Sequence, residues 1–428
     1  MQKFNISSVV FLFIFLFFGL FSFVYNFFEV VLMGYVSALV FNILFIVSFY
    51  FFRNKIIFIG VLFLYLIMFN LSIFVGDDEL YYNQIYNEVF PYIILPIFCF
   101  LLIFPLVYIK RPNLDIVLNN NITFYLCVAL SPFIIYSLSY LLPYTATTLA
   151  MGAKDVRNSL AENSMLPSSI MTTLSVGISL FYPLFIFLIF YCIVKKSNKL
   201  ILFIMFLGVV DGVVGAIIFA ARDRFLWIPL LLLVNYWLWY PYLSSRMKNI
   251  IKLGIFILGS IFLFCLIVFT TSRFSDSNTG VLGSILLYFG AQPYIFSETV
   301  VRHTPELFYG LNLRFPFFLE IIGLNLDPVI RNTPYQWMFG TLFSDFYLMG
   351  GWLYCILLIL IMNGLFYFLY KYNLKHTWLY IILMILHIQI LAQGVFFFSF
   401  GFNGGNFYIL LTVILAILLN FLSKVKFH

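Results

Sequence analysis

Charge is scarce in this 428-residue chain: only 9% of the residues are Asp, Glu, Lys or Arg, whereas 64% are hydrophobic. A water-soluble domain carries far more charge, so a bilayer is the expected solvent for most of the chain. Close cysteine pairs are lacking too, since all five cysteines fall singly inside apolar runs, which argues against disulfides and thiolate metal sites. No Walker motif, zinc-ligand spacing or Gly-x-Ser-x-Gly segment occurs, so we predict no cofactor and no metal. Nothing in the sequence supports nucleic-acid binding.

Long apolar runs dominate what is present. A membrane-spanning helix needs about 20 apolar residues, and the chain offers about a dozen such windows. We predict a single all-α polytopic domain over residues 1–428 with about 12 transmembrane helices. The predicted spans are 7–28, 31–51, 56–75, 90–109, 123–142, 168–194, 200–221, 225–243, 250–272, 340–370, 377–399 and 407–422.

The basic residues predict the orientation of these spans. Fifteen of the 23 Lys and Arg residues fall on alternate loops or at the termini, where Asp115 is the only acid. By the positive-inside rule these loops are cytoplasmic, and so are both termini. The remaining loops are then external. The two longest of these are predicted at residues 143–167 and 273–339, the second between helices nine and ten.

The eight basic residues on the external side differ in kind, because seven of them are Arg, whereas the cytoplasmic set is mostly Lys. Arg is the residue that grips phosphate or carboxylate with two aligned hydrogen bonds, so its excess predicts an anion-binding site. Two alternatives stay open: these Arg residues pair with external acids, or they reach towards lipid phosphates. The set consists of Lys154, Arg157, Arg222, Arg224, Arg273, Arg302, Arg314 and Arg331.

Other polar residues stand close to these arginines or inside spans. Asp211 lies well inside a predicted span, between Gly208 and Gly212, where small residues four apart allow close helix packing. Asp345 lies near the external end of a span, ahead of Gly350-Gly351. We expect both carboxylates to face protein rather than lipid.

The layout resembles that of the bacterial O-antigen and capsule repeat-unit polymerases (Wzy-type). The resemblance covers the whole chain as topology. Locally it rests on Gly215-Ala-Ile-Ile-Phe-Ala-Ala-Arg222-Asp-Arg224 and on Asn332-Thr-Pro-Tyr335 followed by Asp345-Phe346 and Gly350-Gly351. One departure is Tyr347, which stands where the family has a glycine after Asp-Phe.

The resemblance implies a metal-independent membrane glycosyltransferase in the cytoplasmic (inner) membrane, with its active site facing the periplasm or exterior. Its substrates would be donor and acceptor oligosaccharides linked to undecaprenyl diphosphate, and a chain-length regulator would be its partner. Expected diphosphate- or substrate-binding residues are Arg157, Arg222, Arg224, Arg273, Arg302, Arg314, Arg331 and Tyr335. His303 is the expected catalytic base, with Glu306 and Asp345 in reserve.

Two competing functions remain open. An O-antigen ligase shares the architecture and the lipid donor but transfers the glycan to a lipid A core. A lipid-linked oligosaccharide flippase or another transporter would also have about 12 spans, but its ionisable groups would gather near the membrane midplane.

Overall fold

The computed structural model describes residues 33–75, 88–119, 121–151, 166–167, 169–218, 223–273, 283, 286, 288–302, 308–324, 340–372 and 377–424. All regular structure within these ranges is helical. Eight helices are long and apolar enough to cross a bilayer, and a bent pair makes up to nine. This is the architecture of a helical protein embedded in a membrane.

The helices follow one another with short connections. The first part of the chain forms α2 (Gly34–Phe52), α3 (Ile56–Leu71), η1 (Ser72–Phe74), α4 (Val89–Ile103), η3 (Phe104–Tyr108) and α5 (Asp115–Asn119). The middle forms α6 (Ile122–Met151), α8 (Ile170–Ser179), α9 (Tyr182–Lys195), α10 (Lys199–Ile218), α11 (Asp223–Trp239), η4 (Tyr240–Tyr242) and α12 (Ser245–Arg273). The last part forms α14 (Gln292–Tyr294), the π-helix η5 (Ile295–Val301), η6 (Leu311–Leu313), α15 (Pro316–Ile321), α16 (Leu342–Tyr372), α17 (Thr377–Gln393) and α18 (Asn403–Leu422).

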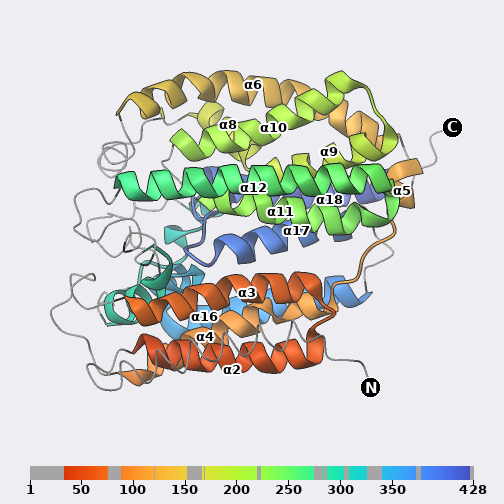
Figure 1. Cartoon of the computed structure of the whole chain (residues 1–428). Helices are drawn as coiled ribbons and strands as arrows, with labels where there is room; N and C mark the ends of the chain where they lie inside the picture. Colours follow the sequence, from red (N-terminus) through yellow and green to blue (C-terminus); the bar gives the residue numbers. More distant parts are fainter. Residues whose placement is uncertain are drawn as a thin grey trace, which may run out of the picture.

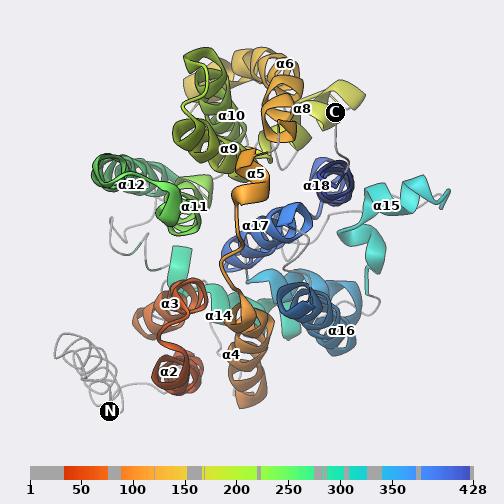
Figure 2. The ribbon, with the colours of Figure 1, turned by 90° about the vertical axis from the view of Figure 1, so that its right-hand side faces the viewer.

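The long helices run roughly alongside one another (Figure 1), and α17 occupies the middle of the bundle when it is viewed end-on (Figure 2). One group contains α2, α3 and α4, and another contains α6 and α8 to α12. The central helix α17 packs against α3 from the first group and against α9 and α11 from the second. It is apolar on every face, as a helix surrounded by other helices must be.

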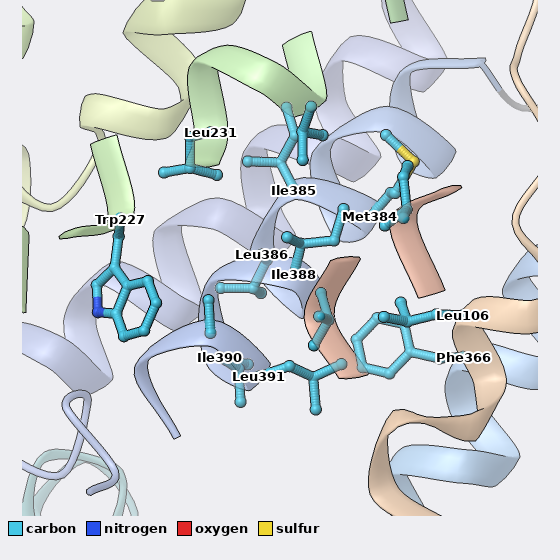
Figure 3. Packing of buried hydrophobic residues seen from close by; sticks show 14 of the residues in the cluster. Leu106, Trp227, Leu231, Phe366, Met384, Ile385, Leu386, Ile388, Ile390 and Leu391 are labelled. Atoms are coloured by element: carbon cyan, nitrogen blue, oxygen red, sulfur yellow. The ribbon is translucent and has the colours of Figure 1, made fainter. Parts of the chain in front are cut away.

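The core around α17 is filled from several helices. Trp227 and Leu231 of α11 approach it from one side, while Leu106 of η3 and Phe366 of α16 approach from the other (Figure 3). By contrast, α12 lies at the edge of the bundle, where Leu253, Phe256 and Phe264 are exposed. Such a face suits lipid rather than water.

Two sets of helix ends define the two ends of the bundle. The α2–α3, α4–α5, α9–α10 and α11–α12 connections lie at one end (Figure 1), which we call the lysine end. There the hydroxyl of Tyr380 receives the Lys110 N–H, and the hydroxyl of Tyr242 receives the Leu114 N–H. The opposite end carries the described residues between 288 and 324 and the start of α16, and we call it the arginine end.

Four predicted spans differ from the structure, and the first span, 7–28, lies outside the described residues. The span predicted at 168–194 is two helices, α8 and α9, with a 50° bend between them. The span at 340–370 is broken at Gly350 and Gly351, whose backbone is not helical. The span at 377–399 ends at Gln393, and that at 123–142 extends to Met151.

The described part of the predicted loop 273–339 also differs from a simple external loop. Residues 288–302 are helical, and Tyr288, Gln292 and Tyr294 are buried against the other helices. The hydroxyl of Tyr294 accepts the Gly34 N–H at the start of α2, where any side chain at position 34 would collide with the tyrosine ring. Tyr288 and Tyr294 are therefore core residues, and neither belongs to an interfacial belt or presents a free ring to a sugar.

Candidate functional site at the arginine end

The strongest polar contact at the arginine end joins Arg314 to Asp345, two residues predicted for separate roles. The Nε of Arg314 donates to Oδ1 of Asp345 at 2.8 Å, and Nη2 contacts the same oxygen. Oδ2 of Asp345 accepts the backbone N–H of Phe398 at 2.5 Å. Both carboxylate oxygens are thus engaged in a site where Asp345 is only 4% exposed. The pair fixes three separate segments of the chain to one another.

The break in α16 places the segment that carries Arg314. Gly351 has φ +66° and ψ −155°, a conformation that essentially only glycine adopts. Because the helix stops here, the carbonyls of Leu348 and Met349 are free of helical partners and accept the N–H groups of Tyr309 and Gly310 at 3.1 and 3.0 Å. The Gly350-Gly351 pair therefore docks the segment before Arg314 onto α16.

The loop between α17 and α18 completes the surroundings of Arg314. Gly401 packs on the Arg314 side chain so closely that a Cβ would lie 2.3 Å from its Cδ. Asn406 in the first turn of α18 donates to the carbonyls of Arg314 and Phe400 at 3.0 and 2.7 Å. The predicted turn at 403–406 is accordingly the start of a helix.

The arginine end also holds Arg224 at the start of α11. Its guanidinium is buried and turns inwards, where Nη1 donates to the carbonyl of Gly212 at 2.5 Å and to Oγ of Ser179 at 3.4 Å. A Cβ on Gly215 would lie 2.6 Å from this nitrogen, so the missing side chain makes room for the arginine. Arg224 is held by neutral oxygens in the described part of the chain.

A polar chain links Arg224 to Arg314 across three helices. The guanidinium of Arg224 lies over the Tyr182 ring, 5.8 Å from its centroid. The Tyr182 hydroxyl accepts from Nε2 of Gln393 at 3.3 Å, and Oε1 of Gln393 accepts from Oγ of Ser399 at 2.5 Å. Ser399 follows Phe398, whose N–H reaches Asp345. We call this set the polar network.

Asp211 lies one residue before the carbonyl that holds Arg224. Its Oδ2 accepts from Oγ of Ser137 at 2.7 Å, and the same hydroxyl is 3.0 Å from the Ser175 carbonyl. The predicted inward pairing of Asp211 is therefore confirmed. So is the close packing at its neighbouring glycines, because Gly208 lies against Phe185 and Gly212 against Tyr182.

Arg302 ends the π-helix η5 and lies 3.8 Å from the carboxylate of Glu298, whose other oxygen accepts from the Tyr92 hydroxyl at 2.8 Å. Glu298 is buried, whereas the Arg302 side chain is 27% exposed. The sequence showed Glu298 only as one more acid in a loop. Its position one helical turn before Arg302 was a signal for the pairing. The π-helix, a feature common at functional sites, has no sequence signal of that kind.

Several predicted residues cannot be placed. Arg157, Arg222, His303, Glu306, Arg331 and Tyr335 lie outside the described residues. Arg273 ends α12, but the position of its side chain is not described. The structure thus places four of the predicted residues, Arg224, Arg302, Arg314 and Asp345, and brings the last two into direct contact.

Chemically, the arginine end offers buried guanidinium groups that already have oxygen acceptors. An anionic ligand there would share these donors with the Gly212 carbonyl, Glu298 or Asp345. Among the residues that the structure describes, no group of three or more His, Cys, Asp or Glu could hold a metal ion. Comparisons of the chain with protein families, with curated proteins and with solved structures find no match.

Proposed function

We propose that the protein is a membrane glycosyltransferase that joins polyprenyl-diphosphate-linked oligosaccharide repeat units, as the O-antigen and capsule polymerases do. The proposal places its active site at the arginine end, facing the exterior of the cytoplasmic membrane, with a chain-length regulator as partner. One observation carries it: Arg224 and Arg314 belong to a single polar network at the end opposite the lysine-rich connections.

The proposed chemistry needs such groups. The bond between the anomeric carbon and the diphosphate oxygen breaks, a new bond forms to an acceptor hydroxyl, and that hydroxyl gives its proton to a base. The diphosphate gains negative charge as it leaves, and preorganised guanidinium donors stabilise that charge by a factor on the order of 10²–10³ for each strong donor. Arg222, Arg224 and Arg302 are the proposed donors, and Arg157, Arg273, Arg331 and Tyr335 are proposed to bind the rest of the substrate.

The contacts of Asp345 refine its proposed role. A base must offer a free lone pair to the acceptor hydroxyl, and both oxygens of Asp345 already accept hydrogen bonds from Arg314 or Phe398. We assign Asp345 to holding Arg314 in position. His303 and Glu306 remain the proposed bases.

The proposal is tested by the surface glycan of a deletion strain complemented with wild type, Arg222→Ala, His303→Ala or Arg314→Lys. The matched control is Arg246→Ala, at an exposed residue of the lysine end. We expect the deletion to leave single repeat units without a ladder, the control to restore the ladder, and the three site variants to restore little of it. Long polymer retained on the polyprenyl lipid would instead identify a ligase.

A transporter is the second candidate, because two helices of the bundle are broken, α8–α9 by a 50° bend and α16 at its glycine pair. Broken helices commonly form the binding sites of secondary transporters. Repeat units trapped on the cytoplasmic side of the deletion strain would favour this function and overturn the catalytic proposal.

A further inference from the structure

Two cations at the lysine end lie over aromatic rings at the end of α11. The guanidinium carbon of Arg111 is 4.7 Å from the centroid of the Trp237 ring, and the Lys248 ammonium is 4.0 Å from that of Tyr240. Trp237 and Tyr240 are three residues apart, about one helical turn, so their rings are neighbours. We call these four residues the cationic corner.

The cationic corner is held by contacts among three segments of the chain. Arg111 comes from the segment after η3, the two rings come from α11 and η4, and Lys248 comes from the first turns of α12. The hydroxyl of Tyr242 donates to Oδ1 of Asn113 at 2.9 Å and accepts the Leu114 N–H at 3.0 Å, which fixes the first segment to the second. The geometry of the two cations is therefore set by the fold.

Neither cation is neutralised within the described part of the chain. The two ion pairs found there involve Glu298 and Asp345, both at the arginine end. The acid nearest in sequence, Asp115, uses its backbone N–H on Asn113. Apart from the ring contacts, the described residues supply no hydrogen-bond acceptor to the side chain of Arg111 or Lys248. The corner thus has net positive charge and free donors.

We propose that the cationic corner binds the phosphate of an anionic phospholipid. An aromatic ring stabilises a cation without using its N–H groups, so both side chains keep their donors for phosphate oxygens. The next turns of α12 expose Leu253, Phe256 and Ile257, which offers acyl chains an apolar track beside the headgroup. A site of this kind is independent of the proposed transfer reaction at the other end of the bundle.

The test is native mass spectrometry of the purified protein in detergent, titrated with cardiolipin, phosphatidylglycerol or phosphatidylcholine. We expect the wild type to retain the two anionic lipids and not the zwitterionic one. Replacing both cations, Arg111→Gln with Lys248→Gln, should weaken binding by about thirtyfold, which is about 2 kcal/mol. The matched control is Lys195→Gln with Lys199→Gln, which removes the same charge from exposed residues of the same end.

A second variant separates a built site from general surface charge. Trp237→Leu keeps both charges but removes the ring that holds Arg111, and it should weaken anionic-lipid binding severalfold. Equal losses in the Arg111/Lys248 variant and in the control, or wild-type binding by Trp237→Leu, would overturn the proposal. So would displacement of the lipid by millimolar inorganic phosphate, which would show a free-phosphate site. A thermal melt followed with a thiol-reactive dye checks the fold of each variant, because Cys99, Cys127, Cys192 and Cys355 are buried.

Discussion

Arg314 and Arg224 are both largely removed from solvent at the same end of the bundle, yet they are stabilised differently. Arg314 contacts a carboxylate directly and is held from three segments. Arg224 donates to a backbone carbonyl and a serine hydroxyl, while the nearby Asp211 accepts from Ser137. The comparison teaches that the first arginine is committed to a partner, whereas the second keeps a charge that neutral groups only solvate. Arg224 is accordingly the better of the two to answer to an incoming anion.

The largest effect should come from breaking the direct pair. Asp345→Asn keeps the shape but leaves the buried Arg314 charge without a counter-ion, so we expect a loss of about 3 kcal/mol in stability. The measurement is thermal unfolding in detergent with the thiol-reactive dye. The double variant Asp345→Asn with Arg314→Met should recover part of the loss. A double variant no more stable than Asp345→Asn would show that the carboxylate acts independently of Arg314.

A smaller effect is expected at the kink that docks the Arg314 segment. Gly351→Ala forces a side chain into a backbone conformation that disfavours it and brings the Cβ within 2.9 Å of Phe308, so we expect destabilisation of about 2 kcal/mol. Gly364→Ala, in the same helix with open space around it, is the control and should be neutral or slightly stabilising. Equal melting temperatures for the two variants would contradict the role given to the kink.

Arg224→Met should cost less, about 1–2 kcal/mol, because it removes hydrogen bonds to neutral groups rather than one half of an ion pair. Under the proposed function the same change should abolish most of the glycan ladder, so activity and stability should separate. Gly215→Ala, which crowds the Arg224 nitrogen, should act in the same direction on activity. An Arg224→Met protein with a normal ladder would show that Arg224 is only structural.

The smallest effect is expected from Ser137→Ala, which removes the hydroxyl that contacts Asp211 and the Ser175 carbonyl. We expect a loss of about 1 kcal/mol. Ser139→Ala, at an exposed residue on the same helix, is the control. A larger loss than that of Arg224→Met would mean that Asp211, and not Arg224, is the sensitive member of this region.

Most of the fold could be predicted from the sequence, because apolar runs of span length have few alternatives to a membrane helix. The breaks were harder. Gly350-Gly351 was visible as a pair, but the non-helical φ and ψ depend on Tyr309 and Gly310 arriving from a distant segment. The bend between α8 and α9 has no glycine or proline at its centre, Leu180-Phe181, although Pro183 follows it.

The candidate site was predicted as a set of residue types and not as a set of pairs. The excess of Arg on one side of the predicted topology identified Arg224, Arg302 and Arg314. Local spacing relates Glu298 to Arg302, but nothing local relates Arg314 to Asp345, which are 31 residues apart. Likewise, Gln393 was expected to face the protein, but its partners Tyr182 and Ser399 come from another helix and from the following loop.

The position of α17 has a consequence for how the chain is made. It is the next-to-last helix in the sequence, yet it fills the centre of the bundle and packs against helices from both groups (Figure 2). During synthesis the ribosome must therefore deliver more than 370 residues before the two groups have the helix between them. Chains that stop before Thr377 would expose the inner faces of both groups to lipid or to other proteins. Premature termination late in the gene should consequently yield membrane-inserted but unassembled chains, which quality-control proteases recognise.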